Sequence, residues 1–137
     1  MQNKIKHLEM IETIIERMAK NSFQLKGWTV TLVTLVNALA AKDSDKRFII
    51  LSIIPIFGFW VLDAIYLRLE RKYKILYAQV AKKKEEEIDF NLNTELIDYS
   101  ECEKRRICFF KCFISKSEIP FYLTLIGTIL ILFFLIF

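Results

Sequence analysis

The sequence predicts an all-α membrane protein with three transmembrane helices, and two observations lead to this prediction. Apolar residues make up 54% of the 137 residues and gather in three runs, whereas the 20 basic and 16 acidic residues lie almost wholly between them. The segments between the runs repeat apolar positions at intervals of three and four, which is the period of an α-helix. We expect an antiparallel helical hairpin that crosses the membrane and continues into the cytoplasm as two arms. The predicted division is a hairpin at residues 1–87 with spans at 27–41 and 48–67, an acidic linker at 88–103, and an interfacial segment with the third span (119–137) at 104–137.

The first arm, residues 3–26, places its apolar side chains on one helical stripe, which consists of Ile5, Leu8, Ile11, Ile15, Met18 and Leu25. No glycine or proline occurs before Gly27. We therefore expect one helix to pass from the cytoplasm into the bilayer. His7 has no neighbouring nucleophile or carboxylate arrangement that suggests catalysis, and we expect it at the surface.

The first predicted span is shorter than the roughly 20 residues that cross a hydrocarbon core. Lys26 and Lys42 flank it, and their long side chains can reach either interface. A cleaved signal peptide is the competing interpretation, because residues 38–40 have the pattern Ala-Leu-Ala. The 26 preceding residues are too long and too acidic for such a leader, so we interpret residues 27–41 as a retained span.

Small residues share one face of the first span, with Asn37 beside them. The face consists of Gly27, Thr31, Thr34, Ala38 and Ala41. Small residues let two helix backbones approach closely, so packing against another helix is the favoured interpretation. The alternative, that the face lines an aqueous path in an oligomer, stays open.

The second predicted span contains one carboxylate, Asp63, near its cytoplasmic end. If the hairpin turns at about position 44.5, facing residues have numbers that sum to about 89, and Lys26 then faces Asp63. We interpret this pair as a pin that holds the hairpin, in preference to an ion relay. Pro55 and Gly58 also permit a kink in this helix.

Beyond the second span, apolar residues continue a helical seam to about Val80, where the charged run KKKEEE (82–87) begins. The linker at 88–103 has five acids and no base, which is typical of a loop or hinge. The next segment mixes bases with aromatic residues, as suits the headgroup layer, and we expect it to lie on the inner leaflet. Its candidate interface residues are Lys104, Arg105, Arg106, Phe109, Phe110, Lys111 and Phe113.

The positions of lysine and arginine predict the orientation. Residues 1–26 hold five, the turn at 42–47 holds three, and residues 68–118 hold twelve. Cytoplasmic segments are enriched in these residues. We therefore expect a membrane protein with a cytoplasmic N-terminus and an external C-terminus.

No motif in the chain specifies an enzyme, a cofactor site or a nucleic-acid module. The three cysteines, Cys102, Cys108 and Cys112, fall on the predicted cytoplasmic side, and a zinc site would need further ligands. We expect them to be reduced, small packing residues. The sequence therefore predicts no metal, no cofactor and no nucleic-acid partner.

Two segments, NSFQLKGW (21–28) and FWVLDAIYLRLERK (59–72), resemble small bacterial membrane proteins with a two-helix hairpin and cytoplasmic helices. The resemblance covers about residues 8–80 and depends on the spacing of Lys26, Gly27, Trp28, Trp60, Asp63, Arg68, Glu70 and Arg71. The architecture is also similar to the SLATT class of antiphage membrane effectors. That similarity implies oligomerisation and membrane disruption after a partner senses infection.

The resemblance therefore leads us to expect a non-enzymatic, oligomeric effector of a bacterial defence system, located in the bacterial inner (plasma) membrane. Its expected partners are the bilayer, further copies of itself and a cytoplasmic protein. It would disrupt the membrane or form a pore. The alternative is a structural or regulatory membrane subunit that anchors or senses through the same arms without forming a pore.

Overall fold

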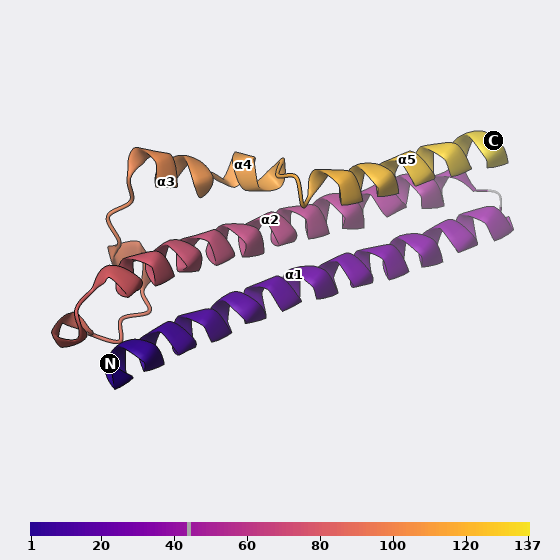
Figure 1. Ribbon diagram of the computed structural model, residues 1–137. Helices are drawn as coiled ribbons and strands as arrows, with labels where there is room; N and C mark the ends of the chain where they lie inside the picture. The colour runs from indigo at the N-terminus through magenta and orange to yellow at the C-terminus, as the bar shows by residue number, and fades with distance from the viewer. Residues whose placement is uncertain (44) are drawn as a thin grey trace.

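The computed structural model describes residues 1–43 and 45–137, and these residues form helices and connecting segments without a strand. The prediction of an all-helical chain is confirmed for this part. Two long helices, α1 (Gln2–Asp43) and α2 (Lys46–Lys82), run antiparallel and lie side by side (Figure 1). The predicted turn centre near position 44.5 involves Ser44, which lies outside the described residues.

We call the end of the hairpin near Asp43 and Lys46 the turn end, and the end with Met1 and Lys82 the distal end. After α2 the chain passes through η1 (Glu85–Glu87) and η2 (Thr94–Leu96) at the distal end. It then returns along α2 as α3 (Glu101–Arg106), α4 (Phe109–Phe113) and α5 (Ile119–Ile136), as Figure 1 shows.

The start and end of α2 and the start of α5 follow from the local sequence. The Asp45 side chain accepts a hydrogen bond from the backbone N–H of Arg47 and caps the start of α2. α2 continues through Pro55 and ends at Lys82, the first residue of the KKKEEE run. Pro120 lies in the first turn of α5, where a missing N–H costs little.

Two apolar clusters hold the helices together. The cluster toward the turn end joins α1, α2 and α5 through Val33, Ala40, Ile49, Ile56, Trp60, Tyr122 and Ile129. The distal cluster buries Ile11, Leu76 and Val80, and three linker residues, Ile88, Leu92 and Ile97, pack on it. The linker is therefore docked on the hairpin and is not a free hinge.

The docked linker corrects the expectation for His7. Its side chain is fully buried, its Nε2 lies 3.0 Å from the carbonyl oxygen of Asn91, and its ring centroid lies 5.7 Å from that of Phe90. A surface position was predicted because the local pattern of α1 cannot reveal a segment that returns from 84 residues away.

Within the described residues two helices, α2 and α5, are long and apolar enough to cross a membrane. Only 11% of the residues of α5 are buried within the chain. Its exposed side chains include Ile131, Phe134 and Leu135. Lipid would solvate such a surface without the penalty that water imposes. The first predicted span, residues 27–41, lies in α1, which is not one of these two helices.

Candidate functional site

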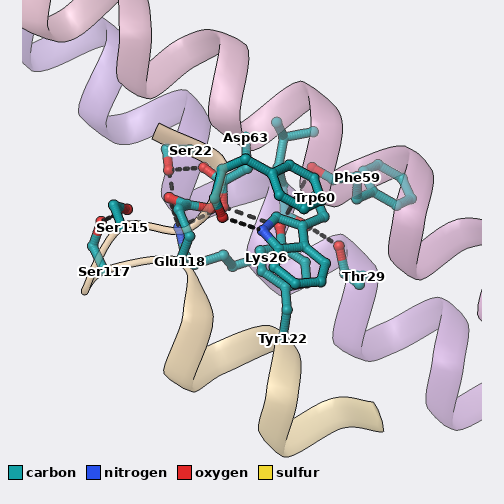
Figure 2. Close-up of polar contacts among 12 residues, drawn as sticks. Ser22, Lys26, Thr29, Phe59, Trp60, Asp63, Ser115, Ser117, Glu118 and Tyr122 are labelled. Carbon is teal, nitrogen blue, oxygen red and sulfur yellow. Dashed lines mark hydrogen bonds and ion pairs between the residues drawn. The ribbon is translucent and has the colours of Figure 1, made fainter. Parts of the chain in front are cut away.

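A buried polar cluster lies where α1, α2 and the start of α5 meet (Figure 2). Lys26 on α1 lies at its centre. Its Nζ is 2.5 Å from Oδ2 of Asp63 on α2 and 3.3 Å from Oε1 of Glu118, the residue before α5. Ser22, one turn earlier on α1, accepts a further hydrogen bond from Nζ at 3.0 Å. One ammonium group thus bridges three segments of the chain.

Asp63 is fully buried and its carboxylate accepts three hydrogen bonds. The hydroxyl of Ser22 donates to Oδ1, whereas Lys26 Nζ and the Tyr122 hydroxyl, at 3.0 Å, donate to Oδ2. These donors and the adjacent ammonium group offset the cost of burying the carboxylate. The two residues that the hairpin register paired, Lys26 and Asp63, are therefore in direct contact.

Glu118 is the second carboxyl group of the cluster, and it has a less complete set of partners. Its side chain is 1% exposed, and its Oε2 has no hydrogen-bond partner among the residues that the structure describes. Burial, and next the neighbouring Asp63 carboxylate, raise the pKa of Glu118 to about 8. Glu118 therefore holds its proton more tightly than an exposed glutamic acid does.

Stacked aromatic rings close the cluster toward α4. The ring of Trp60 lies between those of Phe113, with centroids 4.2 Å apart, and Tyr122, with centroids 5.1 Å apart. Trp60 Nε1 donates a hydrogen bond to the carbonyl oxygen of Phe113 at 2.9 Å. This satisfies the indole N–H and fastens the connection between α4 and α5 to α2.

Sequence reasoning identified Lys26 and Asp63 but missed Ser22, Glu118 and Tyr122. Two signals were present. Ser22 precedes Lys26 by four residues and so shares its helix face, and Glu118 directly precedes the third apolar run. The position of Tyr122 depends on how α5 returns to the hairpin, which no local pattern encodes.

The small-residue face of α1 points away from the rest of the chain. Gly27, Thr31, Thr34, Ala38 and Ala41 are all exposed, and a Cβ atom added at Gly27 would meet nothing within 4 Å. Asn37 does not share this exposure: it is buried toward the bundle, and its Oδ1 has no hydrogen-bond partner in the described part of the chain. The predicted set of six residues is thus divided between two environments.

The predicted interfacial segment forms α3 and α4, which follow one another along α2 and lead into α5 (Figure 1). It therefore runs lengthwise beside α2, with α4 packed on that helix. Phe110 is exposed and Phe109 half-buried, whereas Phe113 packs on Trp60 and so belongs to the bundle. The four predicted basic residues, Lys104, Arg105, Arg106 and Lys111, are exposed.

The cysteines divide in a similar way. Cys112 is buried, as expected of a packing residue, but Cys102 and Cys108 are exposed, so packing does not explain them. Across residues 1–43 and 45–137 no group of three His, Cys, Asp or Glu side chains could hold a metal ion. Comparisons with protein families, with curated proteins and with solved structures found no match to this chain.

The cluster predicts unequal effects for its two ion-pair partners. Lys26→Gln leaves Asp63 buried without a cation, which should lower the free energy of unfolding by about 3–5 kcal/mol. Asp63→Asn should cost less, because Glu118 can ionise and pair with Lys26 instead. Unfolding in detergent micelles measures both losses. Lys20→Gln, an exposed change on the same helix, is the control; equal losses for Lys26→Gln and Asp63→Asn would contradict the role given to Glu118.

The raised pKa of Glu118 predicts a pH dependence of stability. Its folded pKa of about 8 lies above the ordinary value of 4.5, so the folded chain binds this proton more tightly than the unfolded chain. The free energy of unfolding should therefore fall as pH rises from about 5 to 8. Glu118→Gln should flatten this decline, and Glu12→Gln, which alters an exposed acid of α1, should not. Parallel curves for the wild type and Glu118→Gln would refute the prediction.

Proposed function

We propose that this chain is a non-enzymatic, oligomeric protein of the bacterial inner membrane that permeabilises the bilayer when a cytoplasmic partner engages its helical arms. The observation that carries the proposal is the exposed small-residue face of α1. A helix at membrane depth that leaves such a face unpacked within its own chain can pack closely on a second copy. The defence setting comes from the resemblance of residues 8–80 to antiphage membrane effectors.

The packing of α1 along α2 supports three spans. α2 is apolar from Phe48 to Leu62, and residues 27–41 of α1 lie beside this stretch in the antiparallel pair. A bilayer that accommodates α2 would therefore also surround this part of α1. Its 15 residues extend about 22 Å at 1.5 Å per residue, and Lys26 and Lys42 can extend that reach to both interfaces.

The charge distribution supports the orientation. Most lysines and arginines lie on the distal side of the Lys26–Asp63 level, in both arms, the linker region and the α3–α4 segment. The side with more of these residues is cytoplasmic. The N-terminus is then inside, α5 crosses outward, and the polar cluster lies near the cytoplasmic surface of the membrane.

The paired distal halves of α1 and α2 are the proposed site of partner binding. They extend beyond the polar cluster as a rod that the docked linker closes at its tip. A partner that displaces α1 relative to α2 acts on the same two helices that form the spans. The rigid pairing of these helices would transmit the displacement to the small-residue face.

The second candidate function is a structural or regulatory subunit that forms no pore. The polar cluster and the Trp60 stack favour this candidate, because they fix α5 to the hairpin at a level close to the membrane surface. Such a fixed bundle suits an anchor. The two candidates differ in whether the assembled protein conducts.

The proposed orientation predicts the activity of fused reporters. A reporter that is active only outside the inner membrane should be active after Phe137 and inactive after Glu87, because α5 is the only helix between these positions that is apolar enough to cross. A reporter that is active only in the cytoplasm should give the reverse result. Equal activity at both positions would remove α5 as a span.

The small-residue face predicts different effects for the same substitution at two glycines. Gly27 and Gly58 are both exposed and open, but only Gly27 lies on the α1 face. Gly27→Leu should lower the oligomeric fraction and the release of dye from liposomes by roughly tenfold or more, since overpacking a close interface costs about 1–3 kcal/mol. Gly58→Leu is the matched control and should retain both properties.

Cross-linking in nanodiscs and dye release from liposomes are the two measurements. Oligomers that persist in Gly27→Leu would refute the proposed interface. Wild-type oligomers that leave liposomes and the membrane potential of expressing cells intact would favour the subunit without a pore.

A further inference from the structure

A groove of about 900 Å³ lies between the distal half of α2 and the α3–α4 segment. Twelve residues line it, and half of them carry a positive charge: Arg71, Lys74, Arg105, Arg106, Lys111 and Lys116. Glu103 is the one acid in the lining of this groove. We call this feature the basic groove. Its size is within the range of about 300–1,000 Å³ that small-ligand sites occupy.

Most of this charge is not neutralised by the chain. Lys74 pairs with Glu70 at 3.1 Å, but Arg105, Arg106, Lys111 and Lys116 form no ion pair among the described residues. The Glu103 carboxylate is engaged elsewhere, because it accepts a hydrogen bond from the Ser100 backbone N–H at 2.8 Å. Like charges gathered around one cavity repel each other, so an anion bound there would stabilise the fold.

Arg71 ties the two walls of the basic groove together. Its Nη1 donates a hydrogen bond to the carbonyl oxygen of Arg106 at 2.7 Å and lies 3.6 Å from Sγ of Cys112. The end of α3, at Arg106, and α4, at Cys112, are thereby fastened to α2 through a side chain that itself lines the groove. The positions of the basic side chains relative to one another therefore depend on the contacts that Arg71 makes across the groove.

The groove extends to the start of the third predicted span. Ser115 and Lys116 line it and lie between α4 and Ile119, where α5 begins. Ile114 also lines the groove and is 59% exposed. Basic side chains thus lie next to an outward apolar side chain, within a few residues of a helix that is apolar enough to cross a membrane.

We propose that the basic groove binds the phosphate headgroup of an anionic phospholipid from the cytoplasmic leaflet. Arginine pairs with phosphate through two parallel hydrogen bonds, and basic pockets next to membrane spans recognise anionic headgroups. The acyl chains would lie against Ile114 and α5. This proposal rests on the membrane placement given under the proposed function but does not require that the protein permeabilise the membrane.

Native mass spectrometry of the full chain, released from nanodiscs, tests the proposal. Nanodiscs of mixed phosphatidylglycerol and phosphatidylcholine should yield a chain that retains one phosphatidylglycerol molecule in preference to phosphatidylcholine. Each base near a membrane surface contributes about fivefold to the affinity for anionic lipid. Arg105→Gln, Arg106→Gln and Lys111→Gln together should therefore weaken retention by about 100-fold.

A matched triple variant distinguishes binding in the groove from general electrostatic attraction between the basic protein and anionic lipid. Lys6→Gln, Lys20→Gln and Lys82→Gln remove the same charge from exposed positions outside the groove, so retention should stay within about tenfold of the wild type. An equal loss in both triple variants would overturn the site. All six changed side chains are exposed, and circular dichroism should give the same helix content for each variant.

The source of the phosphate is tested by adding glycerophosphoglycerol, the deacylated headgroup of phosphatidylglycerol, which has the same singly charged phosphodiester without acyl chains. Binding of this compound as tight as that of phosphatidylglycerol would overturn the assignment to lipid. Extraction of membranes with alkaline carbonate separates the two proposals. A chain that is extracted overturns the membrane placement and this proposal with it, whereas a retained chain without preference for phosphatidylglycerol overturns this proposal alone.

Discussion

The contact between the Lys26 ammonium group and two buried carboxyl groups determines how α1, α2 and α5 fit together. Apolar contacts along α1 and α2 are non-directional, and a helical pair of this length would tolerate a slip of one turn with much of its apolar burial retained. A slip would separate Lys26 from Asp63 and leave charge uncompensated at low dielectric. The same ammonium also reaches Glu118, so the register of the hairpin and the entry of α5 are fixed at one point.

The contacts that hold the helices together differ on the two sides of the polar cluster. Toward the turn end, aliphatic and aromatic side chains of α1, α2 and α5 pack together and leave a largely apolar exterior. Toward the distal end, a small apolar cluster is supplemented by polar contacts. Glu85 accepts hydrogen bonds from the backbone N–H groups of Asn3 and Lys4 and thereby caps α1, whose first turn contains no acid of its own.

The parts of the fold that depend on local pattern could be predicted. Uninterrupted helical spacing predicts the long helices, and an antiparallel hairpin with a short turn places Lys26 opposite Asp63 by counting alone. Glu118, Tyr122 and the burial of His7 could not be predicted, since they depend on segments that return after two short helices and an irregular linker. Asn37 shows the limit of periodicity within one helix, because it borders the small-residue face yet is turned toward the bundle.

The docked linker has a consequence for the order of synthesis. Ile11 and His7 are covered by residues near positions 90 to 97, so the first arm remains incomplete until the second arm and the linker have left the ribosome. Because chains emerge N-terminus first, the apolar stripe of the first arm is exposed in the nascent chain until the linker follows. Closure of the distal tip therefore requires that the linker has left the ribosome, and α5 follows the linker in the chain. The linker therefore emerges in time to cap the distal end of the hairpin before α5 leaves the ribosome.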